Sequence, residues 1–411
     1  MPMHLSERVK NDIDIHNYEK RLEGALRVVE RSDILPENRE KILKFHKYCF
    51  AEGLSIPRVV RLLQYLHKIA LWLGKDFEKA TKDDIVDLIQ KIEREKLSDW
   101  TKQGYRVTLK KFYRWLQNSE RDPEEVEWIK TSLKKTNNVL PDELLTEDEI
   151  KKLIEACEHP RDRALVSTLY ESGCRIGEIC SLHIKNVSFD EYGVVIIVKG
   201  KTGGRRVRLI ASTPYLASWF DVHPLKDDPD APLWVGIGPT NKNKHLGYPS
   251  IRKTLKVLAA KAKIKKMVNP HAFRHSRATY LANHLTEAQM NQLLGWTQGS
   301  KMTGIYAHMS GRDTDKAVRR IYGLEEEEEK EESPLKPKKC SRCMAMNAGT
   351  SKFCNRCSAV LDIKAALELE EERETKDDLM SILMKDKAVQ AIMAEKIIEL
   401  GLLDELEKRR A

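Results

Sequence analysis

One short segment with a β-strand pattern interrupts a chain whose other periodic segments are helical. The segment is YGVVIIVKGKTGGRRVRLI at residues 192–210. It has a run of five β-branched residues at 194–198, then a Gly-Gly turn, then alternation of polar and apolar side chains through 206–209. This pattern predicts a β-hairpin. The chain is therefore expected to be mainly α-helical with one small β-sheet.

Residues 1–120 have the apolar spacing of amphipathic helices. Thr81 and Ser98 are suited to be N-caps of two of them, and Gly74 to end another. Several aromatic side chains accompany Lys and Arg in the last helix, and their spacing favours core residues over platforms for stacked bases. These aromatics are Tyr105, Phe112, Tyr113 and Trp115. The segment is predicted to be a small helical bundle with one basic face.

Changes in composition divide the rest of the chain. Proline and paired asparagines predict a linker, after which Thr146 and Glu149 form a capping box that begins a helix. A tract of glutamates predicts a hinge. The Leu- and Ile-rich C-terminal helices have too many apolar residues to be solvated alone, so they are expected to pack on a partner helix or another subunit. The predicted divisions are a bundle at 1–120, a linker at 121–145, a second domain at 146–324, the acidic hinge at 325–339, a cysteine cluster at 340–360 and a helical tail at 361–411.

The formal net charge of +9 is unevenly distributed. It is +3 in residues 1–144, +11 in 145–324 and −5 in 325–411. Basic residues cluster at 200–208 and 251–266, and such clusters are typical of surfaces that bind the phosphate backbone of a nucleic acid. A solvated basic helix face is the alternative for either cluster.

The eight cysteines are expected to be reduced. No run of about eighteen apolar residues predicts a membrane span, and the N-terminus has no apolar signal region, so a cytoplasmic protein is expected. Two C-x2-C pairs separated by ten residues have zinc-ribbon spacing, which predicts a closed, structural Zn site. Free or disulfide-bonded cysteines are the alternative. The four ligands would be Cys340, Cys343, Cys354 and Cys357, and the cysteines without such spacing, expected to be core thiols, are Cys49, Cys157, Cys174 and Cys180.

The segment NPHAFRHSRATYLANH, residues 269–284, places His271, Arg274 and His275 on one helix face. A buried face accepts such basic groups only if an anion meets them. Other residues indicate which anion, because phosphodiester transfer without a metal needs guanidiniums to hold the phosphate, a lysine to protonate the leaving oxygen and a tyrosine to attack. The candidate set, in chain order, is Arg175, Lys201, His271, Arg274, Trp296 and Tyr306.

In this order the motifs resemble those of the tyrosine recombinase family, the phage-integrase type. SGCRIGEICSL resembles the first family box, which implies Arg175 as a catalytic arginine and Glu178 as a supporting acidic residue. KGKTGGRRVRL resembles the hairpin with the catalytic lysine. Lys201 is preferred over Lys199 for this role because a K-T-G turn begins at Lys201, and Arg208 stands where a proline is common.

The two later motifs complete the resemblance. HAFRHSRAT resembles the H-x-x-R-H box, which implies His271 and Arg274. LLGWTQGSKMTGIYAH resembles the closing box, which implies Tyr306 as the nucleophile and Trp296 where many members have histidine. His275 and Arg277 are expected to be structural neighbours.

The resemblance implies a two-domain clamp around double-stranded DNA with a specific site. A helical core-binding domain would hold one side, and an α/β catalytic domain would hold the other. Tyr306 would form a 3′-phosphotyrosine, no cofactor would be needed for catalysis, and four protomers would act on two DNAs. The protein would be associated with the nucleoid in the cytoplasm. An integrase of a mobile element is the leading interpretation. A chromosome-dimer resolvase and a catalytically silent DNA-binding regulator are the alternatives.

Overall fold

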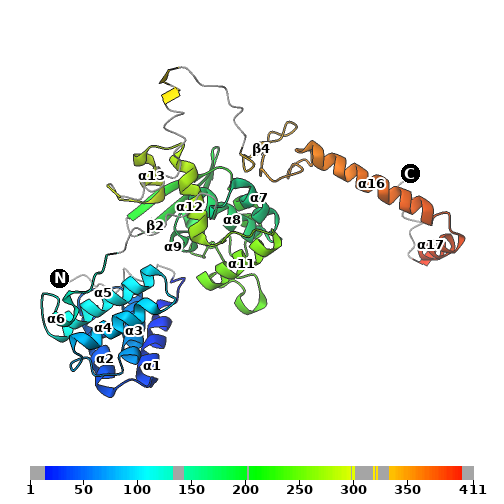
Figure 1. Ribbon diagram of the computed structural model, residues 1–411. Coiled ribbons are helices and arrows are strands. Elements are labelled where there is room, and N and C mark those ends of the chain that lie inside the picture. The colour runs from blue at the N-terminus through cyan, green and yellow to red at the C-terminus, as the bar shows by residue number, and fades with distance from the viewer. Residues whose placement is uncertain are drawn as a thin grey trace.

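The computed structural model describes residues 14–132, 143–200, 203–297, 299–300, 318–319, 321–322 and 333–399. These residues form a helical bundle, a second domain with a small sheet, a short hairpin that carries four cysteines, and two tail helices (Figure 1). The fold class predicted from the sequence, mainly α with a small β-sheet, is confirmed.

The N-terminal bundle forms where the sequence has amphipathic spacing and capping residues. Thr81 closes a capping box with Asp84, the Ser98 side chain accepts the backbone N–H of Thr101, and Gly74 ends its helix at φ 62°. Three of the predicted core aromatics, Tyr105, Phe112 and Tyr113, are buried, and Trp115 is partly buried against the same core. The helices are α1 (Tyr18–Arg31), α2 (Pro36–Ala51), α3 (Ile56–Leu73), α4 (Lys82–Arg94), α5 (Asp99–Leu116) and α6 (Glu124–Glu127).

The bundle extends into the predicted linker. Val126 and Ile129 are buried in the same core as the helices before them. Burial of these apolar side chains stabilises the fold, whereas a solvated linker would leave them exposed to water. The chain that connects the two domains therefore begins later than the expected residue 121.

The second domain is built on an antiparallel sheet of three strands in the order β1-β2-β3. The predicted hairpin is confirmed: Ile196 pairs with Val207, and the side chains of β3 from Arg206 to Leu209 alternate between more exposed and buried. The elements are α7 (Glu147–Glu155), α8 (Pro160–Ser172), α9 (Ile176–Cys180), η2 (Ile184–Asn186), β1 (Val187–Asp190), β2 (Gly193–Gly200), β3 (Gly203–Leu209), α10 (Thr213–Asp221), η3 (Pro239–Asn241), α11 (Tyr248–Lys261), α12 (Pro270–Ala282) and α13 (Glu287–Leu294).

Residues from outside 146–324 complete the core of this domain. Ile15 is 3% exposed there, and its carbonyl oxygen accepts the N–H of Tyr248 at 3.0 Å. Leu335 and Ala348 are also buried in this core. The end of the predicted acidic hinge is therefore docked on the second domain, because burial removes the apolar Leu335 side chain from water. The glutamates before Leu335 had led to its assignment to a hinge.

The cysteine segment forms a small hairpin, β4 (Lys338–Lys339) with β5 (Met346–Asn347). Two helices follow, α16 (Ile363–Leu383) and α17 (Lys387–Glu399), and α16 projects away from the rest of the molecule (Figure 1). Apolar tail side chains such as Ile363 and Ile382 are exposed, so the predicted packing of this tail on a partner stays a prediction. Within the described ranges, no helix is long and apolar enough to cross a membrane.

Candidate active site

Arg274 is held at the centre of the site by α12. The helix begins at Pro270 with Asn269 as its N-cap, whose side chain accepts the N–H of Ala272 at 2.9 Å. The buried Arg274 guanidinium donates to the carbonyl oxygens of Gly173 at 2.9 Å and Leu294 at 2.8 Å. Two neutral carbonyls orient the charge without cancelling it. A buried guanidinium with neutral hydrogen-bond partners is better suited to bind an anion than to serve a structural role alone.

The electrostatics at Arg274 confirm that its charge is poorly compensated. Burial lowers the pKa of Arg274 to about 10, and the positive charge of Arg175 acts in the same direction. The guanidinium still carries its proton at neutral pH. A phosphate placed between the two arginines would relieve their repulsion, because opposite charge favours the protonated forms.

Arg175 is the N-cap residue of α9. Its backbone N–H donates to Glu178 at 2.8 Å, and its guanidinium donates to Glu178 at 3.2 Å and to the carbonyl oxygen of Gly295 at 3.3 Å. The Arg175 side chain is 43% exposed, in contrast to the buried Arg274. The Arg274 guanidinium is therefore fixed by buried hydrogen bonds, and the Arg175 guanidinium is accessible to an incoming ligand.

Arg205 is a site residue that the sequence reasoning missed. It lies on β3, and both of its terminal nitrogens bond the carboxylate of Glu178, at 2.9 and 2.7 Å. Burial alone would raise the pKa of Glu178, but the bonds to Arg205 and the proximity of Arg175 outweigh it and hold that pKa below its usual range. Arg205 also donates to the carbonyl oxygen of Leu293 at 2.9 Å. It therefore ties the hairpin to α9 and to the end of α13.

Two glycines allow these close approaches. Gly295 has φ 63°, and a Cβ at this position would lie 2.6 Å from the Arg205 guanidinium. A Cβ at Gly200 would lie 2.3 Å from a carboxylate oxygen of Glu178. The glycines of the LLGW and GKTGG motifs thus have packing roles at the site.

The remaining predicted site residues are distributed as follows. The Arg274 guanidinium carbon lies 5.5 Å from the Trp296 ring centroid, a cation–π distance, and Trp296 is buried. His271 is exposed one turn before Arg274, with its ring 6.5 Å from that of His275. The predicted lysine and nucleophile, Lys201 and Tyr306, lie outside the described residues. The structure thus brings together Arg175, Glu178, Arg274 and Trp296, and places His271 one turn before Arg274 on α12.

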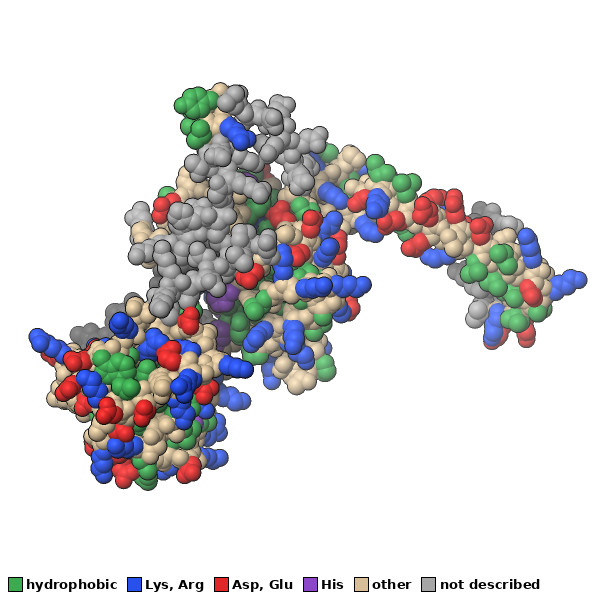
Figure 2. Space-filling model, viewed as in Figure 1, with side chains coloured by type: hydrophobic (Ala, Val, Ile, Leu, Met, Phe, Trp, Pro, Cys, Tyr) green, Lys and Arg blue, Asp and Glu red, His purple; other side chains and the backbone are tan. Residues whose placement is uncertain are grey.

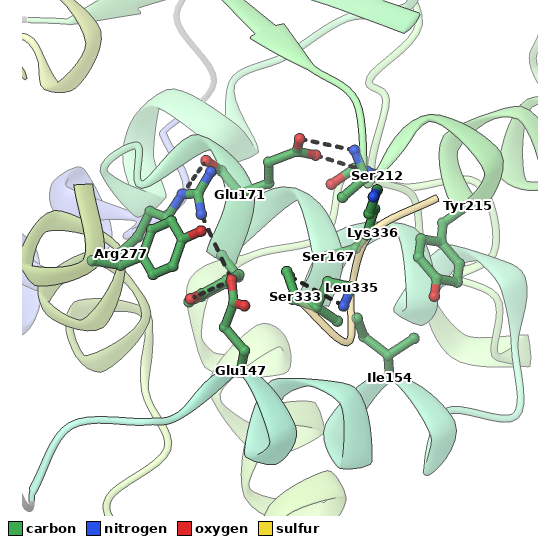
Figure 3. A pocket seen from close by; sticks show the side chains of 13 residues that line it. Glu147, Ile154, Ser167, Glu171, Ser212, Tyr215, Arg277, Ser333, Leu335 and Lys336 are labelled. Carbon is green, nitrogen blue, oxygen red and sulfur yellow. Dashed lines mark hydrogen bonds and ion pairs between the residues drawn. The ribbon is translucent and has the colours of Figure 1, made fainter. Parts of the chain in front are cut away.

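A second cluster lines a pocket that includes Glu147, Glu171 and, from α12, Arg277 (Figure 3). Arg277 donates to the backbone carbonyl of Glu171 at 3.0 Å and stacks between the rings of Tyr170 and Tyr280, at 5.3 and 5.0 Å. The Glu171 carboxylate accepts the backbone N–H groups of residues 210, 211 and 212. Arg277 therefore has the structural contacts that the sequence predicted for it, and Glu171 links α8 to the end of β3.

The four predicted ligands of the cysteine hairpin converge. The sulfur atoms of Cys340, Cys343, Cys354 and Cys357 all lie within 4.8 Å of one another, and two of the distances are 3.5 Å. A tetrahedral Zn²⁺ with bonds of about 2.3 Å needs sulfur atoms about 3.8 Å apart. The donor set and its spacing thus fit a four-thiolate metal site. The other four cysteines are buried, as predicted.

A buried amide braces this cluster. Asn347 is 0% exposed, its side chain donates to the carbonyl oxygen of Ala345 at 2.9 Å, and it accepts the N–H of Asn355 at 2.9 Å. It joins the two cysteine knuckles. Met344 and Ser358, where glycines are usual, adopt positive φ angles of 60° and 56°.

Comparison with known proteins decides the family. Residues 143–312 match the Phage integrase family. The tyrosine recombinase XerA of Pyrococcus horikoshii is 25% identical over 298 residues, which cover 72% of this chain and 98% of that protein. The chain belongs to the tyrosine recombinase family. XerA of Pyrococcus furiosus is 32% identical over 183 residues, which cover 44% of this chain and 62% of that relative.

A solved structure has the same fold as this tyrosine recombinase. The XerH site-specific recombinase, in a post-cleavage complex bound to a palindromic difH substrate, has a TM-score of 0.53 and 19% identity. The likeness covers 76% of this chain and 98% of that one. Family membership makes the chain a site-specific recombinase. The residues after 312 lie beyond the matched family region.

Arg205→Ala is expected to destabilise the tyrosine recombinase fold by about 3–5 kcal/mol, because Glu178 would remain buried without its main partner. Thermal or urea unfolding measures this loss. Arg205→Lys retains the charge but not the paired bonds, so it should recover part of the stability. The neighbouring exposed Arg206 provides a matched control, and equal stability of Arg205→Ala and Arg206→Ala would contradict this role.

Proposed function

We propose that this recombinase cuts and rejoins DNA strands through a 3′-phosphotyrosine at Tyr306. The observation that carries the proposal is the pair of guanidiniums: Arg274 is buried and donates to two carbonyl oxygens, and Arg175 is partly exposed. Such a pair can hold the non-bridging oxygens of a phosphate and stabilise the charge that builds in the transition state.

The chemical steps follow from the residue types. The Tyr306 oxygen attacks phosphorus as the bond from phosphorus to the 5′ oxygen breaks. Lys201 gives its proton to that 5′ oxygen, and we assign acceptance of the phenol proton to His271, since imidazole exchanges protons near neutral pH. A 5′-hydroxyl of a second strand then attacks the phosphotyrosine and releases Tyr306. The energy of the phosphodiester bond is kept in the covalent link, so the proposed chemistry needs no metal or nucleotide.

The assembly belongs to the same proposal. The structurally similar XerH is described in complex with its DNA substrate. We infer that this chain binds double-stranded DNA in the same way, through its +11 catalytic segment, and that four protomers act on two DNAs. We further assign Zn²⁺ to the four thiolates of the cysteine hairpin, where it would stabilise the fold of that hairpin without taking part in catalysis.

A suicide substrate tests this function. Its nick next to the scissile phosphate lets the short 5′ strand diffuse away, so cleavage leaves protein bound covalently to DNA. Protein with its zinc content verified is expected to form this adduct without added divalent metal and with EDTA present. A DNA-binding regulator would form none. Free 3′-hydroxyl ends made only with added metal would show a nuclease instead.

Sequencing the trapped DNA from cells separates the enzyme alternatives. Adducts at the junctions of one mobile element would favour an integrase. Adducts at a single chromosomal site would favour the chromosome-dimer resolvase.

The leaving-group role of Lys201 has its own test. Lys201→Ala should cleave an ordinary substrate poorly but recover on a substrate with a 5′-thio leaving group, which needs no general acid. Lys199 is exposed on the same hairpin and provides the matched control. Rescue of Lys199→Ala in place of Lys201→Ala would move the role to Lys199.

A further inference from the structure

The two cysteine knuckles have the same basic residue at the same position. C-S-R-C at 340–343 and C-N-R-C at 354–357 each place an arginine directly before the second thiolate. Arg342, Arg356 and the adjacent Lys339 are all exposed. We name these three side chains the cationic edge of the hairpin.

Among the described residues, no ion pair joins a carboxylate to the cationic edge. Within the described ranges, the ion pairs from this segment to the tail are made by other lysines, Lys338 with Asp362 and Lys352 with Glu368. Residues 333–361 contain six Lys and Arg but no Asp or Glu. A Zn²⁺ held by four thiolates would remove only part of that charge. The hairpin is therefore a positive surface between two acidic segments of the sequence.

The hairpin is also fixed in place. Leu335 and Ala348 are buried in the core of the catalytic domain, and the Tyr215 hydroxyl lies 2.6 Å from that of Thr350. Gly349 packs so closely that a Cβ there would lie 2.8 Å from the backbone of Leu335. Figure 2 shows Lys and Arg side chains where the long tail helix leaves the catalytic domain. Charged side chains on a docked hairpin lose less conformational entropy on binding than charged side chains on a flexible arm.

We propose that the cationic edge binds the phosphate backbone of duplex DNA, as a second DNA contact apart from the scissile phosphate. The proposal rests on the proposed function, because that function supplies the duplex. Arginine favours phosphate, since its planar fork can donate two parallel hydrogen bonds to phosphate oxygens. The acidic centre of α16 in another copy is the competing partner. The repeated arginines and the basic charge of the adjoining domain favour DNA.

The experiment measures how DNA affinity depends on salt. Each phosphate contact contributes about 0.9 to the slope of log affinity against log salt, so the variant Lys339→Ala/Arg342→Ala/Arg356→Ala should have a slope shallower by about 2.7. Its affinity near 0.1 M salt should fall roughly ten- to hundredfold. The matched control is Lys376→Ala/Lys385→Ala/Lys387→Ala, which removes the same charge from exposed positions on the tail. It should retain the wild-type slope.

Two further measurements keep the outcomes distinct. Zinc content of the first variant should equal that of wild type, and at saturating protein both should form the same amount of covalent adduct on a suicide substrate. Failure of wild type itself to form adduct would reject the proposed function. With wild-type cleavage intact, an unchanged salt slope in the zinc-loaded variant would overturn the second DNA contact. An unchanged slope with weaker self-association would assign the cationic edge to the acidic tail of another copy, which also overturns the proposal.

Discussion

Tyr306→Phe is expected to abolish covalent protein–DNA adducts while DNA affinity stays at the wild-type level. The substitution removes one oxygen atom, and that atom is the proposed nucleophile, so no weaker version of the reaction remains. Adducts on a suicide substrate are counted by denaturing electrophoresis. DNA affinity is measured in parallel on the intact site.

A matched substitution provides the control for this result. Tyr192 is 68% exposed at the turn between β1 and β2, so Tyr192→Phe makes the same chemical change away from the site. It should leave adduct formation unchanged. Wild-type adduct yield from Tyr306→Phe would reject Tyr306 as the nucleophile.

Removal of either arginine should lower strand cleavage by about two to three orders of magnitude or more, because charge placed in advance at the phosphate is usually a large part of catalysis. Arg175→Ala is the cleaner change, since that side chain is partly exposed. Arg274→Ala also removes two buried hydrogen bonds to Gly173 and Leu294 and will cost stability. Single-turnover cleavage rates, measured beside unfolding midpoints, separate the two effects.

Arg274→Lys distinguishes charge from geometry at this position. Lysine keeps the positive charge but cannot reach both carbonyl groups and a phosphate with one planar fork. Its cleavage rate is expected to stay well below that of wild type. Arg252, exposed on α11, provides the control Arg252→Ala, which should cleave at the wild-type rate when DNA is saturating. Wild-type rates from both Arg175→Ala and Arg274→Lys would contradict the phosphate-binding role of the pair.

Local chemistry made much of the fold predictable. The helix starts at Thr81 and Thr146 depend on capping side chains three residues apart, and both capping boxes are present. The hairpin was predictable from a β-branched run and a glycine turn within one short segment, and β2 and β3 pair antiparallel across that turn. The cysteine cluster was readable because ligand spacing along the chain limits the geometry of a metal site.

The parts that escaped prediction depend on contacts between distant segments. Arg205 looked like one more residue of a basic cluster, and only its bonds to Glu178 and Leu293 reveal its position in the site. Its place directly after the Gly-Gly turn and two residues before the apolar Val207 was the available signal, because β alternation puts Arg205 and Val207 on the same face of the strand. Leu335 was assigned to a hinge because of the charge of its neighbours, although it is buried against the catalytic domain.

A truncation at residue 324 would remove Leu335 and Ala348 and expose the part of the core that they cover. Full-length protein is therefore the proper material for these experiments.

The central claim is that Tyr306 carries the DNA strand, and peptide mapping of the trapped adduct tests it most directly. Protein is reacted with a suicide substrate, the complex is digested with nuclease and protease, and the modified peptide is identified by mass spectrometry. The account predicts one nucleotide-bearing peptide, with the phosphate on Tyr306 and the DNA attached through its 3′ end. Modification of a different residue, or attachment through a 5′ end, would contradict it.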